Sequence, residues 1–242
     1  MFLHYRTKSF VLKKEDRGEA DQIFTVFSEE FGKLEILGKG IRKISSKLRA
    51  GIDIFYLNEI EFIQGKTHKI LTDAILMNKF EEIRRDIKRT EIAYKIAEIV
   101  DSLVGGEEKD DEIWEMIIKT FKKLNNSKIK NEKLEIIYFY FFWNLSTLLG
   151  YQPELYRCLF CQKKLKLERL FFTKEGVICN FCQKKLKLGR EILIGITPDV
   201  IKILRIILKK DFDLLLKLRI EKEKINLLKK ITNSYYLNIL KQ

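Results

Sequence analysis

The stretch Asp21–Leu37, DQIFTVFSEEFGKLEIL, decides the fold of the N-terminal part of the chain. Asp21–Ser28 is rich in residues that favour β-strands, a glycine turn follows, and Gly32–Leu37 alternates polar and apolar residues. Outward from this hairpin, comparable apolar runs occupy residues 9–13, 52–63 and 69–76. Five short strands separated by glycine turns within residues 1–79 predict a small barrel, and a five-stranded OB-fold β-barrel is the natural candidate.

The periodicity changes from strand to helix at residue 80. Apolar residues then recur every three or four positions over residues 80–103, 110–124, 132–149, 197–209 and 213–240, which predicts amphipathic helices. Four cysteines lie within residues 156–190, here called the cysteine segment, and interrupt this pattern. We therefore predict an α+β multidomain protein, with the barrel over residues 1–79 and an α-helical domain over residues 80–242 that carries the cysteine segment as an insertion.

The four cysteines have the spacing C-x2-C-x17-C-x2-C, which is typical of a four-cysteine zinc site. The first repeat, Cys158–Leu167, reads CLFCQKKLKL, and the second repeat, Cys179–Leu188, reads CNFCQKKLKL. Four thiolates fill the tetrahedral shell of Zn²⁺ and leave no open position for water or substrate. We predict one structural zinc ion, bound by Cys158, Cys161, Cys179 and Cys182. A redox pair would need an adjacent βαβ unit, and a pair of disulfides would need an exported chain.

The sequence between the two cysteine pairs predicts a β-hairpin that turns at Glu175-Gly176. Gln162 and Gln183 follow the second cysteine of each pair, where we expect a left-handed backbone that favours glycine. Two interpretations of the nearby lysines stay open: contact with phosphate groups, or electrostatic compensation of the negative Zn–thiolate centre. These lysines are Lys163, Lys164, Lys166, Lys184, Lys185 and Lys187.

The net charge of +13 is unevenly distributed along the chain. Residues 156–190 contain ten basic and two acidic residues, whereas residues 81–155 are net acidic. Such asymmetry favours a polyanionic partner, most often nucleic acid. A lysine-rich genome would raise the basic count everywhere, and the reversals of sign argue against that as the whole explanation.

A second basic stretch, Gly38–Arg49, reads GKGIRKISSKLR and is here called the basic loop. Its two glycines allow close backbone approach, and its serines can donate to phosphate oxygens. It has neither the G-x4-G-K-[ST] order of a P-loop nor the G-x-G-x-x-G order of a dinucleotide site. A run of this kind beside a barrel face is suited to binding a nucleic-acid backbone. The alternative is a solvated surface loop.

Two blocks of sequence resemble the bacterial RecO family. The first contains Gly18-Glu19-Ala20-Asp21, then Phe31-Gly32-Lys33, then the stretch from Gly40 to Ser46. The second, GYQPELYRCLFC over residues 150–161, is similar to the family's G-Y-x-P-x-L-x-x-C-x-x-C. The resemblance runs in order along essentially the whole chain. Two glutamines, Gln162 and Gln183, depart from it, because glycine commonly stands at those positions.

The resemblance implies a DNA repair and recombination mediator with an N-terminal OB-fold, a helical domain and a zinc-binding insertion. It implies binding of single- and double-stranded DNA, annealing of complementary strands, and two partners: RecR and the C-terminal tail of single-stranded DNA-binding protein. It implies no catalytic residues, no membrane and no small-molecule substrate. Some members lack the cysteines, so zinc is not central to the shared function. Lys33, Lys39, Arg42 and Lys43 fall on basic positions of the family's OB-fold and are the residues that we predict to contact DNA; Lys47 and Arg49 extend this DNA-binding set.

An OB-fold and zinc-ribbon factor that binds RNA or assists translation is the alternative function. A metal-dependent hydrolase would need clustered carboxylates, and the acidic run at residues 107–112 is better read as a loop and helix start. We predict no enzyme. The N-terminus does not have the order of a signal peptide, and no uncharged apolar stretch is long enough to span a bilayer. We therefore expect a cytoplasmic, nucleoid-associated protein.

Overall fold

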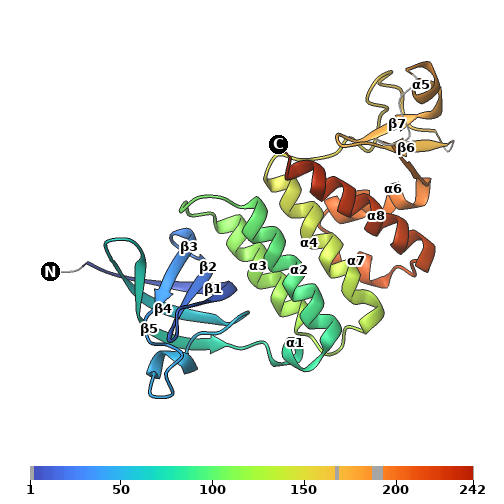
Figure 1. The fold of residues 1–242 in the computed structure, drawn as a ribbon. Coiled ribbons are helices and arrows are strands. Elements are labelled where there is room, and N and C mark those ends of the chain that lie inside the picture. Colours follow the sequence, from blue (N-terminus) through green and yellow to red (C-terminus); the bar gives the residue numbers. More distant parts are fainter. Residues whose placement is uncertain (1–2, 167–168, 187–192, 242) are drawn as a thin grey trace. The chain divides into compact units, whose positions relative to one another are not determined.

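The structure is a computed structural model that describes residues 3–166, 169–186 and 193–241. The chain forms two compact units, residues 1–134 and 135–242, which are described separately (Figure 1). The first unit holds all five strands of the barrel together with three helices. The second holds the remaining helices and the cysteine segment. The predicted boundary between residues 79 and 80 is a different division and stays a prediction.

A closed five-stranded barrel occupies the first part of the chain, as predicted (Figure 1). The strand order is β1-β2-β3-β5-β4, and β4 closes the barrel by pairing with β1. All neighbours are antiparallel except β3 and β5, which run parallel. The strands are β1 (His4–Arg17), β2 (Asp21–Ser28), β3 (Gly32–Gly38), β4 (Leu57–Gln64) and β5 (Lys69–Asn78).

The barrel interior is filled by apolar side chains that alternate along the strands. Phe24 and Val26 of β2, Ile60 and Phe62 of β4, and their neighbours form one buried cluster. Each fully buried side chain of this size contributes roughly 1.5–3 kcal/mol relative to an exposed one. On the outer face of β1, Phe10 packs against Phe121, with ring centroids 4.3 Å apart. The barrel therefore has an apolar core inside and a second apolar contact with the helices of its own unit.

The long apolar run at residues 52–63 is a strand only in its second half. Ile52 and Phe55 are buried but lie in the loop before β4, where Phe55 has a left-handed backbone (φ 61°). The Phe55 N–H donates to the Val11 carbonyl (2.9 Å), and the Val11 N–H donates to the Tyr56 carbonyl (3.0 Å). The prediction of one strand here was wrong, because these residues are apolar for burial and not for strand pairing.

The first unit ends in α1 (Glu81–Arg85), α2 (Ile87–Leu103) and α3 (Asp111–Leu124). A single helix was expected over residues 80–103, but the chain breaks at Asp86, which is extended and caps α2. Its carboxylate accepts from the Arg89 N–H at 3.1 Å, a favourable helix start. Ile87 was included in the predicted apolar stripe but is 87% exposed at the start of α2, so its place in the stripe was wrong.

The second unit is built around α4 (Leu134–Leu148), whose aromatic residues are buried on almost every side. Trp143 is fully buried, and its ring N–H donates to the Thr232 hydroxyl at 3.1 Å. Thr232 lies on α8 (Lys222–Ile239). The predicted helix that begins at Thr197-Pro198 is α6 (Pro198–Leu208), with Thr197 accepting from the Val200 N–H.

The helix expected over residues 213–240 is two helices, α7 (Phe212–Lys217) and α8, separated by an extended Leu218. Phe212 and Leu215 are buried on α7, and Leu228 is buried on α8. On one straight helix Leu228 would point about 160° away from Phe212, at about 100° per residue. The buried side chains of α7 and of α8 can both reach the core only if the chain turns between the two helices. The prediction of one helix was therefore wrong.

The cysteine segment contains β6 (Leu170–Phe172), β7 (Val177–Cys179) and the short helix α5 (Asn180–Lys185). The antiparallel pairing of β6 and β7 confirms the predicted hairpin. A third strand that was not predicted, β8 (Ile194–Ile196), pairs with the other edge of β6.

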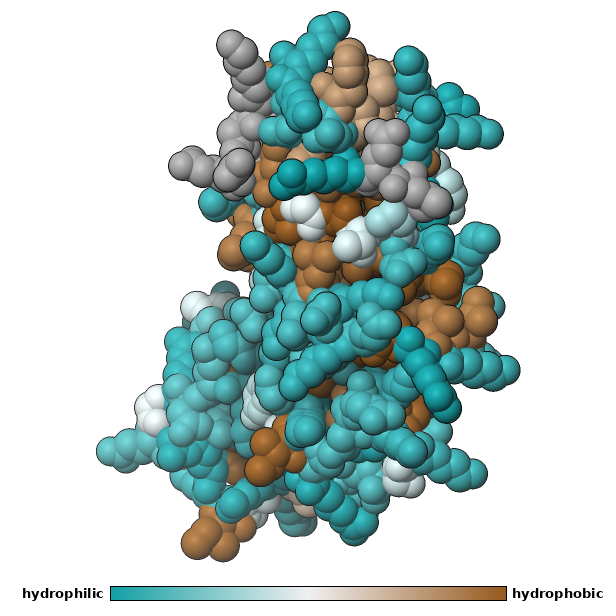
Figure 2. Space-filling view, turned by 90° about the vertical axis from the view of Figure 1, so that its right-hand side faces the viewer, coloured by the Kyte–Doolittle hydropathy of each residue, from teal (hydrophilic) through white to brown (hydrophobic). Residues whose placement is uncertain are grey.

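Within the described residues, no helix is both long and apolar enough to cross a membrane. The face drawn in Figure 2 is covered mainly by hydrophilic side chains.

Candidate metal centre and nucleic-acid interface

The four cysteines converge on one point. Their sulfur atoms all lie within 4.8 Å of one another, and the Cys161 and Cys179 sulfurs are 4.0 Å apart. Sulfurs bound to one tetrahedral Zn²⁺ at about 2.3 Å would lie roughly 3.8 Å apart, so the arrangement fits a metal ion of this kind. Cys158 and Cys182 are buried, and Cys161 and Cys179 are half-buried. These four side chains could therefore hold one metal ion.

The two repeats reach this point by different backbone paths. In the first, the Gln162 N–H donates to the Cys158 carbonyl (2.9 Å), and Gln162 is left-handed (φ 57°), as predicted. In the second, Cys179 ends β7 and Gln183 lies inside α5 with a helical backbone. The prediction of a left-handed Gln183 was wrong. A strand leads directly into the second repeat and lets a helix form there.

The thiol environments favour ionised sulfur at one cysteine and oppose it at another. Burial would raise the pKa of Cys158, but the backbone N–H groups of Cys161, Cys179 and Phe160 outweigh burial and lower the pKa to about 6. Burial, together with hydrogen bonds from the neighbouring sulfurs, raises the pKa of Cys182 to about 12. Four thiols packed this closely need a cation before all of them can ionise. The donor set and the burial thus suit a thiolate-bound metal.

The basic loop is anchored at its start by the turn between β1 and β2. The Asp21 carboxylate accepts from the Gly40 N–H (2.7 Å), and the Ala20 carbonyl accepts from the Arg42 N–H (2.9 Å). Ile41 is buried in the barrel core. These contacts give the Gly-Glu-x-Asp motif a physical role: its aspartate holds the loop. Sequence reasoning named neither Asp21 nor Ile41 as positioning residues, and the sequence carries no signal that separates Ile41, which is buried, from Ile44, which is exposed.

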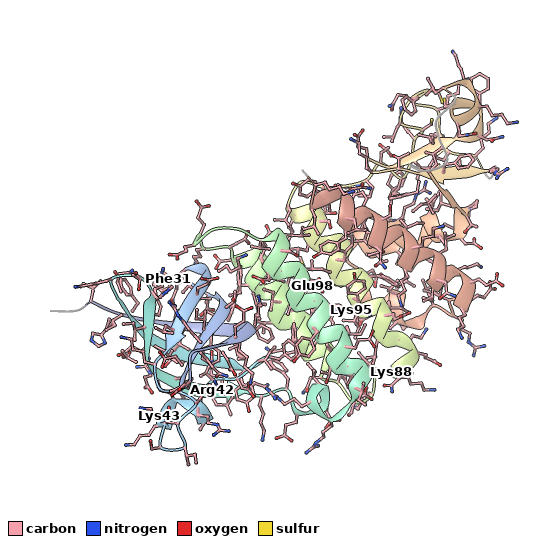
Figure 3. All side chains as sticks on the ribbon, viewed as in Figure 1. Phe31, Arg42, Lys43, Lys88, Lys95 and Glu98 are labelled. Carbon is pink, nitrogen blue, oxygen red and sulfur yellow. The ribbon has the colours of Figure 1, made fainter. Side chains whose placement is uncertain are left out.

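The middle of the basic loop projects into solvent. Lys39, Arg42, Lys43, Lys47 and Arg49 are all exposed, and Figure 3 shows Arg42 and Lys43 together on the loop that follows β3, away from Phe31 at the other end of that strand. Arg42 lies 3.3 Å from the Asp16 carboxylate and donates to the Gly18 carbonyl. The other four form no ion pair among the described residues. Ile44, at the loop tip, is 97% exposed.

Lys33 does not belong to this exposed group. Its side chain is half-buried, lies 3.6 Å from the Asp101 carboxylate and donates to the Asp101 carbonyl. Asp101 lies on α2, so the lysine links the barrel to a helix of the same unit. Its charge is therefore partly neutralised, and its place in a DNA contact rests on the resemblance alone.

The cysteines are the sole group of three or more His, Cys, Asp and Glu residues placed to hold a metal ion in the part of the chain that the structure describes. The acidic run at residues 107–112 does not gather into such a group. Of the six lysines in the two repeats, Lys187 lies outside the described residues, as do Leu167 and Leu188 at the repeat ends.

Comparison with known proteins gives matches over both parts of the chain. Residues 1–80 match the family model described as Recombination protein O N terminal, and residues 84–242 match Recombination protein O C terminal. Among similar proteins, one from Dehalococcoides mccartyi strain 195 is 26% identical over 220 residues, covering 90% of this chain and 84% of the relative. One from Caldicellulosiruptor saccharolyticus is 27% identical over 237 residues, covering 98% and 93%. Both relatives carry the name DNA repair protein RecO.

Proposed function

The chain belongs to the RecO family of DNA repair proteins, and from this membership we propose that it binds single- and double-stranded DNA through the basic loop and anneals complementary strands. The family matches confirm the resemblance noted in the sequence. The observation that carries the proposal is the basic loop itself: five exposed basic side chains on a loop without acidic residues, held to the barrel by Asp21 and Ile41.

The mechanism follows from charge. Two complementary strands repel each other through their phosphates, and repulsion falls when lysine and arginine neutralise the phosphates and release counterions. Lys39, Lys43 and Lys47 have no carboxylate to compete with phosphate within the described part of the chain. A loop that neutralises one strand while leaving its bases free allows pairing to proceed without ATP or a catalytic group. We accordingly propose that the protein acts as a binding protein and not as an enzyme.

We propose Zn²⁺ as the ion held by Cys158, Cys161, Cys179 and Cys182. The support is the all-thiolate donor set, which zinc accepts, and sulfur separations close to those of a tetrahedral site. When bound, the metal ties the two repeats together, and its binding free energy stabilises the cysteine segment. The four side chains complete the shell, so the ion has a structural role.

Two protein partners are proposed from the family alone: RecR and the C-terminal tail of single-stranded DNA-binding protein. No residue of this chain is assigned to either contact. We also propose that the protein works in the cytoplasm, at the nucleoid.

A strand-annealing assay tests the function. Two complementary oligonucleotides, one carrying a fluorophore and the other a quencher, are mixed with the wild-type protein or with the K39A/R42A/K43A variant. We expect the wild type to accelerate annealing and the variant to lose most of the acceleration. The matched control is K88A/K122A/K128A, which removes the same charge from exposed positions on the helices and loops of the same unit.

Each outcome of that assay bears on one part of the proposal. Wild-type protein that does not accelerate annealing would overturn the proposed function. Equal losses in both triple variants would overturn the basic loop as the DNA site. Tighter binding of RNA than of DNA of the same sequence, without annealing, would favour the RNA-binding alternative.

A further inference from the structure

Two phenylalanines stand exposed at equivalent positions of the two repeats. Phe160 and Phe181 each directly precede the second cysteine of their pair, and they are 54% and 69% exposed. The buried cluster of the cysteine segment contains Cys158, Ile178 and Cys182 but neither phenylalanine. Within the described residues, neither ring contacts another aromatic ring. These side chains therefore do not contribute to the local core, although phenylalanine is costly to leave in water.

The lysines have the same offset from the phenylalanine in both repeats. Lys163 and Lys164 follow Phe160 by three and four residues, and Lys184 and Lys185 follow Phe181 in the same way. All four are exposed, as is Lys166, and none has a carboxylate partner in the described part of the segment. Among the described residues of the cysteine segment, the only acidic residue is Glu175. It lies at the hairpin turn, beside Lys174. The lysines are thus available to an external anion.

The two repeats also share one surface. A hollow of about 170 Å³ lies beside the sulfur atoms, and it is lined by Phe181 of the second repeat and by lysines of the first. At the upper end of Figure 2, where the cysteine segment lies, hydrophobic surface appears among hydrophilic side chains. The residues that line the hollow are Cys158, Cys161, Lys163, Lys164, Lys166, Leu170, Cys179 and Phe181.

We propose that the exposed side of the cysteine segment is a second contact for single-stranded DNA, in which unpaired bases stack on Phe160 and Phe181 while Lys163, Lys164, Lys184 and Lys185 contact the phosphates. Phe181, Lys163 and Lys164 line the hollow, and Phe160, Lys184 and Lys185 are exposed outside its lining. The proposal rests on the DNA-binding function proposed above and adds a site to it. Every base offers a π-face, and exposed aromatic rings beside cations bind single strands with little sequence preference. In a duplex the bases are already stacked, so the surface prefers single strands.

An acidic peptide is the other occupant that lysines and phenylalanines could attract. Single-stranded DNA fits better, because two separate exposed rings with the same lysine offset match a polymer that repeats a base and a phosphate. A peptide anchored by an apolar residue would instead need one enclosed apolar groove, and the hollow here is lined by Phe181 but not by Phe160, so the two rings do not share such a groove.

The test compares F160A/F181A with wild type in a fluorescence anisotropy titration of labelled oligo(dT) and of a duplex of equal length. The matched control is L214A/L237A, which removes two exposed apolar side chains from helices of the same unit. Loss of one base stack lowers affinity by about fivefold or more. We expect at least that loss for oligo(dT), a smaller loss for the duplex, and no loss in the control. Bound zinc, measured after thiol modification, should be the same in all three proteins.

A second measurement does not depend on affinity. In F160W/F181W, indole fluorescence should be quenched on addition of oligo(dT), since a stacked base quenches indole, and affinity should stay within about twofold of wild type. Oligo(dT) affinity unchanged in F160A/F181A, or no quenching in the tryptophan variant, would overturn the proposal while leaving the basic loop in place. Binding of an acidic peptide that requires both Phe160 and Phe181, without such an effect on oligo(dT), would overturn it in favour of a peptide site. Wild-type protein that binds no DNA at all would instead overturn the proposed function.

Discussion

The barrel encloses ten buried residues in one cluster, all of them apolar, whereas the cluster of the cysteine segment contains three among the residues that the structure describes, and two of these are the metal-ligand candidates Cys158 and Cys182. Apolar burial of roughly 1.5–3 kcal/mol per large side chain can stabilise the barrel, whereas Ile178 is the one large apolar side chain that is fully buried in the described cluster around the sulfur atoms. The two regions therefore depend on different chemistry for their stability. A DNA contact on the barrel should therefore survive loss of the metal, and a contact on the cysteine segment should not.

Removal of the metal should have the largest effect and should separate the two regions. Structural zinc contributes about 10–16 kcal/mol in zinc-finger peptides, so a strong chelator should unfold β6, β7 and α5. Hydrogen–deuterium exchange would then show loss of protection in the cysteine segment and retained protection in β1–β5. Simultaneous loss of protection in both regions would contradict the separation.

A core substitution in the barrel should have the converse effect. Phe62 is buried and stacks on Tyr5, with ring centroids 5.3 Å apart. Phe62→Ala leaves a cavity and should lower the free energy of unfolding of the barrel by about 3–5 kcal/mol, measured by urea denaturation. Zinc content should not change. The control is Ile44→Ala, which removes an exposed apolar side chain and should change stability by less than about 0.5 kcal/mol.

The two repeats of the cysteine segment should respond oppositely to the same substitution: glycine in place of glutamine should stabilise one repeat and destabilise the other. Gln162 has a left-handed backbone, which costs a non-glycine residue roughly 1–2 kcal/mol. Gln162→Gly should stabilise the segment by up to about 1 kcal/mol, less the hydrogen bond that the Gln162 amide donates to the Leu159 carbonyl (2.9 Å). Gln183→Gly, inside α5, should destabilise it by about 0.5–1 kcal/mol. The affinity of each variant for zinc, measured in competition with a chelator, reports both changes in stability. Changes in the same direction would contradict the difference in backbone path between the two repeats.

The smallest expected effect on stability is that of Asp86, which caps the start of α2. The backbone N–H of Arg89, followed in effect by the Asn131 side chain, holds the pKa of Asp86 below its usual value. A lowered folded-state pKa means that the contribution to stability is present above the unfolded pKa, about 4, and is lost as the pH falls through the folded-state value. Asp86→Ala should cost about 0.5–1 kcal/mol at neutral pH.

The control for this prediction is Asp86→Asn, which can still cap the helix and should remove the acid dependence. Thermal melts at neutral pH and below about pH 4 distinguish the variants. If the stability of Asp86→Asn falls at low pH as much as that of the wild type, the loss of stability comes from other carboxylates.

The parts of the fold that could be predicted are those in which a residue's local pattern and its burial agree. Asp21–Ser28 forms β2 with the predicted bounds, and the Thr197-Pro198 helix start and the hairpin at Gly176 were correct. β1 extends to Arg17, beyond its predicted end, because its last five residues are exposed and show no apolar alternation. The pairing of β8 with β6 joins strands that are distant in sequence, and local patterns do not encode such pairing.

The candidate site was predictable in its composition but not in its arrangement. The cysteine spacing indicated one cluster, and the four sulfurs do converge. The five basic side chains of the basic loop are exposed in the structure, whereas Lys33, also predicted to contact DNA, is half-buried and lies beside Asp101. Its ion pair with Asp101 depends on the tertiary fold. The different paths of the two repeats were also hidden, since nine of their ten residues are the same.

The salt dependence of single-strand affinity tests whether the basic loop is the DNA-binding site. The dissociation constant of wild-type protein and of K39A/R42A/K43A for oligo(dT) is measured over a range of salt concentrations, each with and without a zinc chelator. For single strands the slope of log K against log salt is about −0.7 per phosphate neutralised. We expect the three substitutions to reduce the slope by about 2, whether or not the chelator is present. Identical slopes for wild type and variant would contradict the assignment of DNA binding to the basic loop.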